Sequence, residues 1–184
     1  MAITIDKDAI DGPLARELRG LSDVEVVDCY QCGKCSAGCP VVDAMDILPN
    51  RVIRLAQLGQ FDEILRSKTI WLCASCETCT ARCPREVDIA AVMDALREMS
   101  LKAGLAGKNA REVTAFHRAF LDTVWAFGRM QEFSLVGDYK MRSGKFLQDV
   151  LVAPLMFLRG KLHFVPRPIK GRKEVREIFK KCGY

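Results

Sequence analysis

The chain has 184 residues, of which 49% are hydrophobic and 28% charged, and its formal net charge is +5. This composition excludes wholesale disorder, and the length suits one domain or a compact module with an extension. The charge is uneven, because residues 1–100 carry 11 Lys and Arg against 16 Asp and Glu, whereas residues 101–184 carry 17 against 7. The two parts therefore offer partners opposite electrostatic character.

The first predicted helix covers 13–20 (PLARELRG), with a proline near its start and a glycine near its end. Apolar residues recur at helical spacing over 48–71, which predicts two short helices separated by Gly59. The clearest helix is 88–104 (DIAAVMDALREMSLKAG), in which Asp88 is the expected N-cap and Gly104 the expected end.

The later part of the chain gives weaker signals. A further helix is predicted from about 108 to 130, followed by a turn-like segment, SLVGDYKMRSGKF, at 134–146. Two X-Pro steps within 161–171 favour extended chain, and a short basic helix is predicted at about 173–181. Strand signals are sparse throughout, so the predicted class is all-α.

No targeting or membrane segment is predicted. The start of the chain, MAITIDKDAIDGPLARELRG, is acidic and lacks the apolar stretch of a secretory signal. The most apolar later segment, FLQDVLVAPLMFL at 146–158, is shorter than a membrane span and contains Asp149 and Pro154. The expected location is therefore cytoplasmic, where cysteines at fixed spacing are metal ligands or catalytic groups more often than disulfides.

Two runs of four cysteines share one spacing: CYQCGKCSAGCP at 29–40 and CASCETCTARCP at 73–84. Both fit C-x2-C-x2-C-x3-C-P, the bacterial ferredoxin run, whose fourth cysteine ligates the other cluster when a protein holds two. The spacing therefore predicts two 4Fe–4S clusters with crossed iron ligands. The first cluster is expected on Cys29, Cys32, Cys35 and Cys83, and the second on Cys73, Cys76, Cys79 and Cys39. Such crossed ligation would tie the two runs together and contribute to folding.

Alternatives to clusters fit these cysteines less well. Structural zinc usually takes two C-x2-C pairs or Cys/His mixtures, so the third cysteine and the Cys-Pro step would be superfluous. Disulfides are disfavoured by the expected compartment. The ninth cysteine, Cys182, stands in no motif and is interpreted as a free thiol. No nucleotide-binding fingerprint or nucleophile–base pair accompanies the cysteines, so we predict electron transfer and no catalytic residue in this chain.

Residues beside the cysteines carry weaker expectations. Gly33 would allow the backbone to approach a cluster closely, yet Glu77 holds the matching place in the second run, so glycine is not expected to be required there. Tyr30 and Trp71 either shield the clusters from water or pack in the core.

The first cysteine run, the helical spacer, IWLCASCETCTARCP and the following VDIAAVMDALREMSLKAGL resemble the C subunit of heterodisulfide reductase over about residues 15–105. The resemblance implies an alpha-helical ferredoxin-like domain with two 4Fe–4S clusters at 1–105. The positive charge of residues 106–184 and the apolar residues within 146–158 predict that this extension, helical or extended, docks a partner. The resemblance also implies an oxidoreductase complex. In such a complex this subunit relays electrons from a flavin- and iron–sulfur-containing A subunit to the B subunit, which carries the disulfide-reducing site and a cysteine-rich cluster.

Other functions stay open at this point. The cysteine runs alone also suit a free-standing two-cluster ferredoxin, or the iron–sulfur subunit of another oxidoreductase such as succinate dehydrogenase, fumarate reductase or glycolate oxidase. Residues 159–184 hold nine Lys and Arg against two Asp and Glu, a balance that can contact nucleic acid. Apolar residues are interspersed there, as at a protein interface, so no nucleic-acid partner is predicted.

Overall fold

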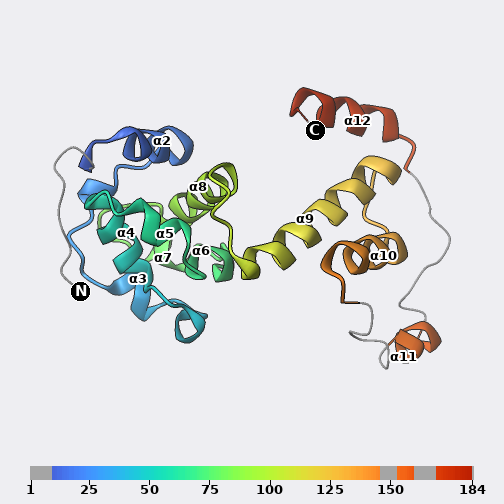
Figure 1. The fold of residues 1–184 in the computed structure, drawn as a ribbon, viewed down its shortest axis with the longest axis horizontal. Coiled ribbons are helices and arrows are strands. Elements are labelled where there is room, and N and C mark those ends of the chain that lie inside the picture. Colours follow the sequence, from blue (N-terminus) through green and yellow to red (C-terminus); the bar gives the residue numbers. More distant parts are fainter. Residues whose placement is uncertain (1–9, 146–152, 160–168, 184) are drawn as a thin grey trace. The chain divides into compact units, whose positions relative to one another are not determined.

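The computed structural model describes residues 10–145, 153–159 and 169–183 (Figure 1). All regular elements among them are helical, so the all-α class is confirmed. The chain divides into two units, residues 1–110 and 111–184. The extended chain predicted at the X-Pro steps falls within 160–168, outside the described residues. The first seven residues of the apolar segment 146–158 also lie outside them. Within the described part of the chain, no helix is long and apolar enough to cross a membrane.

The first unit is a set of short helices around one longer helix, α8 (Ile89–Lys102). The others are α2 (Pro13–Ser22), η1 (Val26–Asp28), α3 (Lys34–Ala37), η2 (Val42–Ala44), α4 (Pro49–Gln57), α5 (Phe61–Leu65), α6 (Thr69–Leu72) and α7 (Thr78–Ala81), where η marks a 3-10 turn. Helix α8 contacts α2, α5, α6 and α7. Its apolar face therefore forms the centre of the core, which includes the fully buried Ile53, Ile64, Ile70, Val92, Met93, Leu96 and Met99.

The predicted helix ends are largely observed. Asp88 caps α8, since its side chain accepts a hydrogen bond from the backbone N–H of Ala91 at 3.0 Å. Gly59, with φ +70°, separates α4 from α5 as expected. Helix α2 runs two residues past Gly20, so that glycine lies near the end of the helix, as expected. It stops at Asp23, which adopts a left-handed conformation and donates its N–H to the carbonyl of Arg19 at 2.9 Å.

A long-range cap fixes the start of α6, the helix that leads into the second cysteine run. The carboxylate of Asp46 accepts hydrogen bonds from the backbone N–H groups of Lys68 and Thr69, at 2.8 and 3.0 Å, and from the Thr69 hydroxyl at 2.8 Å. Desolvation opposes the charge on Asp46, but these bonds outweigh it and lower the pKa of the carboxyl group. The loop after the first run is thereby tied to the beginning of the second.

We expect Asp46→Ala to destabilise the protein by about 1 kcal/mol, the usual value for a lost helix cap. Because the folded-state pKa of Asp46 is lowered, its contribution is fully present above the unfolded pKa of about 3.9 and is lost as the pH falls through the folded value. Urea unfolding under anaerobic conditions should therefore give the same difference between the two proteins at pH 7 and pH 5. A difference that shrinks between these pH values would contradict the assignment.

The second unit contains four helices in its described residues: most of α9 (Lys108–Phe127), then α10 (Glu132–Ser143), α11 (Ala153–Leu158) and α12 (Arg172–Lys181). The turn-like interpretation of 134–146 is wrong over α10. That helix is capped by the Gln131 side chain, which accepts from the N–H of Ser134 at 2.6 Å, and ends at Gly144 in the left-handed region. An ion pair of 2.8 Å between Asp138 and Arg142, one turn apart, supports it.

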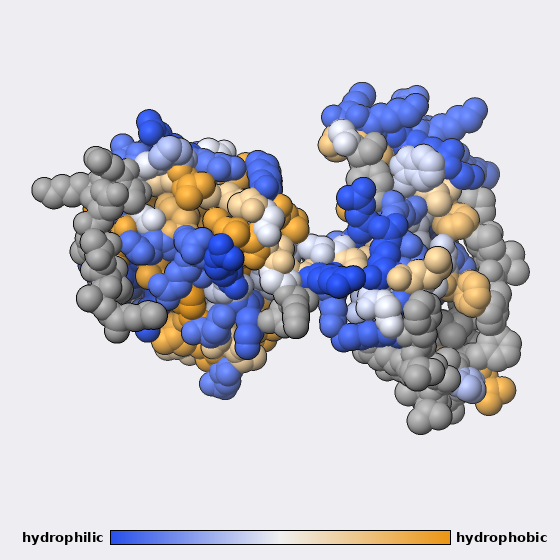
Figure 2. Space-filling model, viewed as in Figure 1, coloured by the Kyte–Doolittle hydropathy of each residue, from blue (hydrophilic) through white to orange (hydrophobic). Residues whose placement is uncertain are grey.

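Among its described residues, the second unit buries few apolar side chains. Phe116 of α9 contacts Tyr139 of α10 edge-on, with ring centroids 6.0 Å apart, and Arg176 of α12 lies 4.4 Å from the ring centroid of Trp125. Several large apolar residues nevertheless remain exposed, up to 75% for Met141 and 81% for Leu158. The surface of α12 is mainly hydrophilic (Figure 2). This unit therefore presents both apolar and basic surface.

Candidate metal centre

The two cysteine runs follow the same backbone path. Gln31 and Ser75, which stand at matching places, have φ values of +64° and +47°. Gly33 and Glu77 also match, at +77° and +58°. The left-handed region disfavours residues other than glycine by about 1–2 kcal/mol, so the loop must impose it on Glu77. Gly33 has open space where a Cβ would stand, so it serves the backbone conformation and not a close approach to protein atoms.

A four-residue helix follows each pair of left-handed residues, and α3 packs against α7. Each of these helices is fastened to the start of the next long helix by one hydroxyl group. Ser36 donates to Oδ1 of Asn50 in α4 at 2.6 Å, and Thr80 donates to Oδ1 of Asp88 at the start of α8 at 2.9 Å. The two halves of the site are therefore built alike, around an α3–α7 contact that brings the two runs together.

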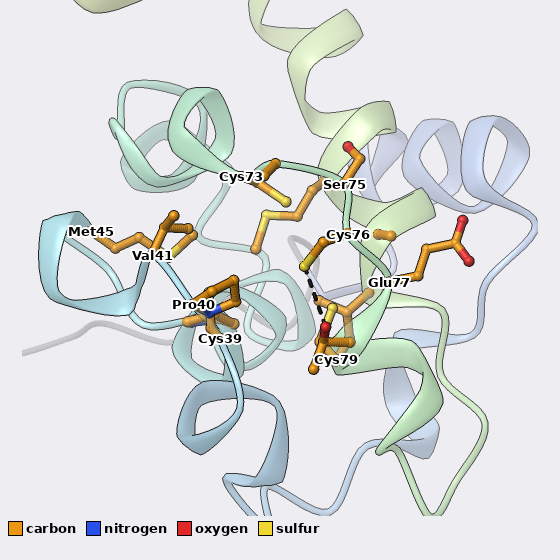
Figure 3. Close-up of a pocket in the computed structure, with 15 residues that line it drawn as sticks. Cys39, Pro40, Val41, Met45, Cys73, Ser75, Cys76, Glu77 and Cys79 are labelled. Carbon is orange, nitrogen blue, oxygen red and sulfur yellow. Dashed lines mark hydrogen bonds between the residues drawn. The ribbon is translucent and has the colours of Figure 1, made fainter.

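One pocket gathers the cysteines predicted to bind the second cluster (Figure 3). It has a volume of about 400 Å³, its open mouth included, and Cys39 of the first run lines it together with three cysteines of the second run, Cys73, Cys76 and Cys79. Apolar side chains complete the wall, among them Val41, Met45, Ile89 and Met93. The donor set and the apolar surroundings fit a cubane cluster, which is bound by thiolates and tuned by solvent exclusion.

Two of the other four cysteines, Cys32 and Cys83, lie near Tyr30. The pKa of the Tyr30 hydroxyl is raised by desolvation, by a hydrogen bond with Cys32 and by the nearby Cys83 thiol, which comes from the second run. The Cys83 sulfur also accepts the backbone N–H of Val87 at 3.3 Å, as ligand sulfurs of clusters often do. Cys35 is buried and Cys29 half-buried. Tyr30 is exposed and Trp71 is buried, so only Trp71 fits the expectation of core packing.

The thiols differ in their readiness to ionise. Burial raises the pKa of Cys35 and of Cys79, the third cysteine of each run. A hydrogen bond with Thr78, 3.5 Å between sulfur and oxygen, lowers the pKa of the exposed Cys76. Since metal ligands must be thiolates, cluster binding releases protons from the buried thiols. All nine cysteines are free of disulfides, and no three His, Cys, Asp or Glu side chains in the described residues converge on a single ion.

Thiol alkylation should separate the cysteines. In the anaerobically purified protein only Cys182, which is exposed, should react quickly with iodoacetamide, because the remaining thiols are iron ligands. After the clusters are removed, Cys76 should react first and Cys35 last, since alkylation needs an accessible thiolate. Peptide mass spectrometry would report the order. Rapid labelling of a cysteine in either run of the cluster-loaded protein would remove that residue from the ligand set.

Each cluster-binding loop is also held by a side chain from the helix that follows it. Gln57, at the end of α4, donates to carbonyl groups of the first loop, and Arg97, in α8, donates to carbonyl groups of the second. Reasoning from the sequence missed both residues, as it missed Asp46. No motif marks them, because each contact joins positions more than twenty residues apart.

Comparison with known proteins agrees with this geometry. Residues 28–88 match the family model of the 4Fe-4S dicluster domain. The chain is 38% identical over 93 residues to the iron–sulfur C subunit of the CoB–CoM heterodisulfide reductase of Methanopyrus kandleri, a match that covers 50% of this chain and 48% of that protein. It is 32% identical over 112 residues to the C subunit of the H(2):CoB-CoM heterodisulfide,ferredoxin reductase of Methanothermobacter marburgensis. That match covers 61% of this chain and 60% of that protein.

A third relative is the C2 subunit of the H(2)/formate:CoB-CoM heterodisulfide,ferredoxin reductase of Methanococcus maripaludis, 40% identical over 76 residues, or 41% of each chain. The chain thus spans between 41% and 60% of the length of these relatives. The matches confirm the prediction of two 4Fe–4S clusters and the resemblance found in the sequence. Residues 28–88 thus match a 4Fe–4S dicluster domain, and the chain is similar over 41–61% of its length to iron–sulfur C subunits of heterodisulfide reductases.

Proposed function

We propose that this chain is the electron-transfer subunit of a cytoplasmic heterodisulfide reductase-like complex. It relays electrons from a flavin-containing A-type subunit, through two 4Fe–4S clusters, to a B-type subunit that carries the disulfide-reducing site. When bound, each cluster takes up and releases one electron at a time. The chain's own residues hold the clusters at a fixed separation, exclude water from most of their surface and offer docking surface to the partner subunits.

The observation that best supports this function is the pocket in which Cys39 meets Cys73, Cys76 and Cys79. With a cysteine borrowed from the other run, that site supplies four thiolates, one for every iron of a cubane. The second set, Cys29, Cys32, Cys35 and Cys83, is proposed on the same pattern. Fully ligated irons leave no position for a substrate, so the chemistry suited to this site is electron transfer.

Exposed cysteines give each proposed cluster an edge at the surface. Cys32 belongs to the first set and Cys76 to the second, and both are exposed. An electron can therefore enter at one cluster and leave at the other without crossing the rest of the protein. We assign this relay to residues 1–105 and partner docking to residues 106–184.

A free-standing ferredoxin is the alternative function. The exposed apolar surface of the second unit argues against it, because a protein that diffuses between partners rarely leaves residues such as Phe133, Met141 and Leu158 in water. Anaerobic affinity purification of the chain from its native extract distinguishes the two. We expect it to bring down a flavoprotein and a cysteine-rich iron–sulfur protein in fixed ratio, and the flavoprotein to reduce the clusters. A monomer with two clusters and no stable partner would favour the ferredoxin instead.

A further inference from the structure

Two long side chains hold the cluster-binding loops at matching carbonyl groups. Nε2 of Gln57 donates to the carbonyls of Val26 and Cys29, at 2.8 and 2.9 Å. In the second loop Nε of Arg97 donates to the carbonyl of Ile70 at 2.5 Å, and its Nη2 donates to that of Cys73. Each pair consists of the first cysteine of a run and the residue three places before it. The two loops are therefore fastened in the same way, by different residue types.

The difference between the two fastenings is one of charge. Gln57 is neutral, whereas Arg97 places a guanidinium group against the loop of the proposed second cluster. The Arg97 side chain is only 20% exposed, and its Nη1 also donates to the Ser75 hydroxyl at 3.3 Å and to Asp94 at 2.5 Å. Reduction adds a negative charge to a cluster, so a poorly solvated positive charge nearby favours the reduced form.

Acidic groups near the same loop act in the opposite direction. Asp94 is 58% exposed and Glu77 is also exposed, so water screens both of them more than Arg97. The first loop is flanked by the exposed Lys34 and by the pair of Arg85 and Asp28, 3.6 Å apart and about half-exposed. Arg82 of the second run lies beside Gly38 and is exposed too. These groups are all screened by water, so among the described residues the least screened charge difference between the loops is Arg97.

We propose that Arg97 is a positioning residue that makes the cluster on Cys73, Cys76 and Cys79 the easier of the two to reduce, with Gln57 as its neutral counterpart at the first cluster. An electron shared between the clusters then resides mainly on the second one, in whose pocket Cys39 lies. This inference rests on the ligand sets of the proposed function. It adds to them a direction of electron flow, toward the partner that contacts the second cluster.

The test is a redox titration followed by EPR on the anaerobic full chain, with each signal assigned by substitution of Cys29 or Cys73. Arg97→Gln should lower the midpoint of the second cluster alone. At a fixed ambient potential we expect its ratio of reduced to oxidised form to fall about threefold or more, where a tenfold fall corresponds to 59 mV for one electron. Asp94→Asn removes the opposing charge from an exposed site and should raise the midpoint of the second cluster. At the same ambient potential, its ratio of reduced to oxidised form should rise about twofold.

Opposite shifts from the two substitutions distinguish charge from loop damage, because a merely structural effect would have no reason to change sign. Arg66→Gln is the matched control, since Arg66 pairs with Asp62 one turn away on the surface of the same unit. It should move neither midpoint. If Arg97→Gln fails to retain the second cluster, the midpoint shift of Asp94→Asn serves as the test on its own.

The role of Arg97 is overturned if Asp94→Asn leaves the second midpoint unchanged or lowers it, or if Arg66→Gln shifts it as much as Arg97→Gln does. Failure of the proposed function would look different. In that case the unmodified chain would lack two cluster signals, or the signal lost with Cys73 would not depend on Cys39. Two normal clusters with midpoints indifferent to Arg97 and Asp94 would reject only the role of Arg97.

Discussion

Replacing Cys39 with alanine should remove the cluster bound by Cys73, Cys76 and Cys79 and leave the other cluster in place. Cys39 is the only cysteine of the first run that lines the described pocket of the second. Without it one iron of that cubane loses its thiolate, and the half-buried thiol of Cys79 loses the metal that keeps it ionised. Iron and sulfide should fall from about eight of each per chain to about four.

The reciprocal substitution and a control complete this test. Cys83→Ala should remove the cluster of Cys29, Cys32 and Cys35 instead, because Cys83 lies near Tyr30 of the first run. Cys182→Ser should leave both EPR signals, since that thiol is exposed and belongs to neither run. If Cys39→Ala instead abolishes only the signal of the Cys29 cluster, the ligands are paired within each run. Zinc at near-stoichiometric amounts with little sulfide would reject clusters altogether.

The sequence revealed those parts of the site that local spacing controls. Three cysteines with two residues between neighbours can bind one cubane only in a few backbone conformations. The structure repeats the same conformation in both runs, down to the left-handed Gly33 and Glu77. Helix α8 was equally predictable from the sequence, because Asp88 caps it and its apolar residues face one side. In each case the interacting residues lie within a few positions of one another.

Contacts between residues far apart in the chain could not be predicted from the sequence. Asp46, Gln57 and Arg97 bind backbone groups more than twenty positions away, and nothing in their neighbourhood indicates this. Helix α10 was missed for a different reason. Gly137 and the polar residues around it lower helix propensity, and the compensating cap from Gln131 lies before the segment that looks turn-like.

The second unit is expected to act as the docking surface for the catalytic partner. Residues 106–184 carry 16 Lys and Arg against 7 Asp and Glu, and the described part exposes large apolar side chains over α9, α10 and α12. Met141→Asp tests one point of this surface. Because Met141 is 75% exposed, the substitution should cost the fold little, yet it should weaken co-purification with the partner severalfold if α10 is in the interface. Leu101→Asp, at an exposed site on α8, is the matched control.

Ending the chain at Gly107 should have the largest effect on complex formation. All eight motif cysteines and the core around α8 lie before that point, so the shortened protein should keep both clusters and their EPR signals. It should nevertheless fail to co-purify with the catalytic subunit, and electron flow to that subunit should collapse, because nothing then holds a cluster within tunnelling distance of its acceptor. A shortened chain that still assembles into an active complex would disprove the docking role. One that loses its clusters or precipitates would show instead that the second unit is a structural cap for the first.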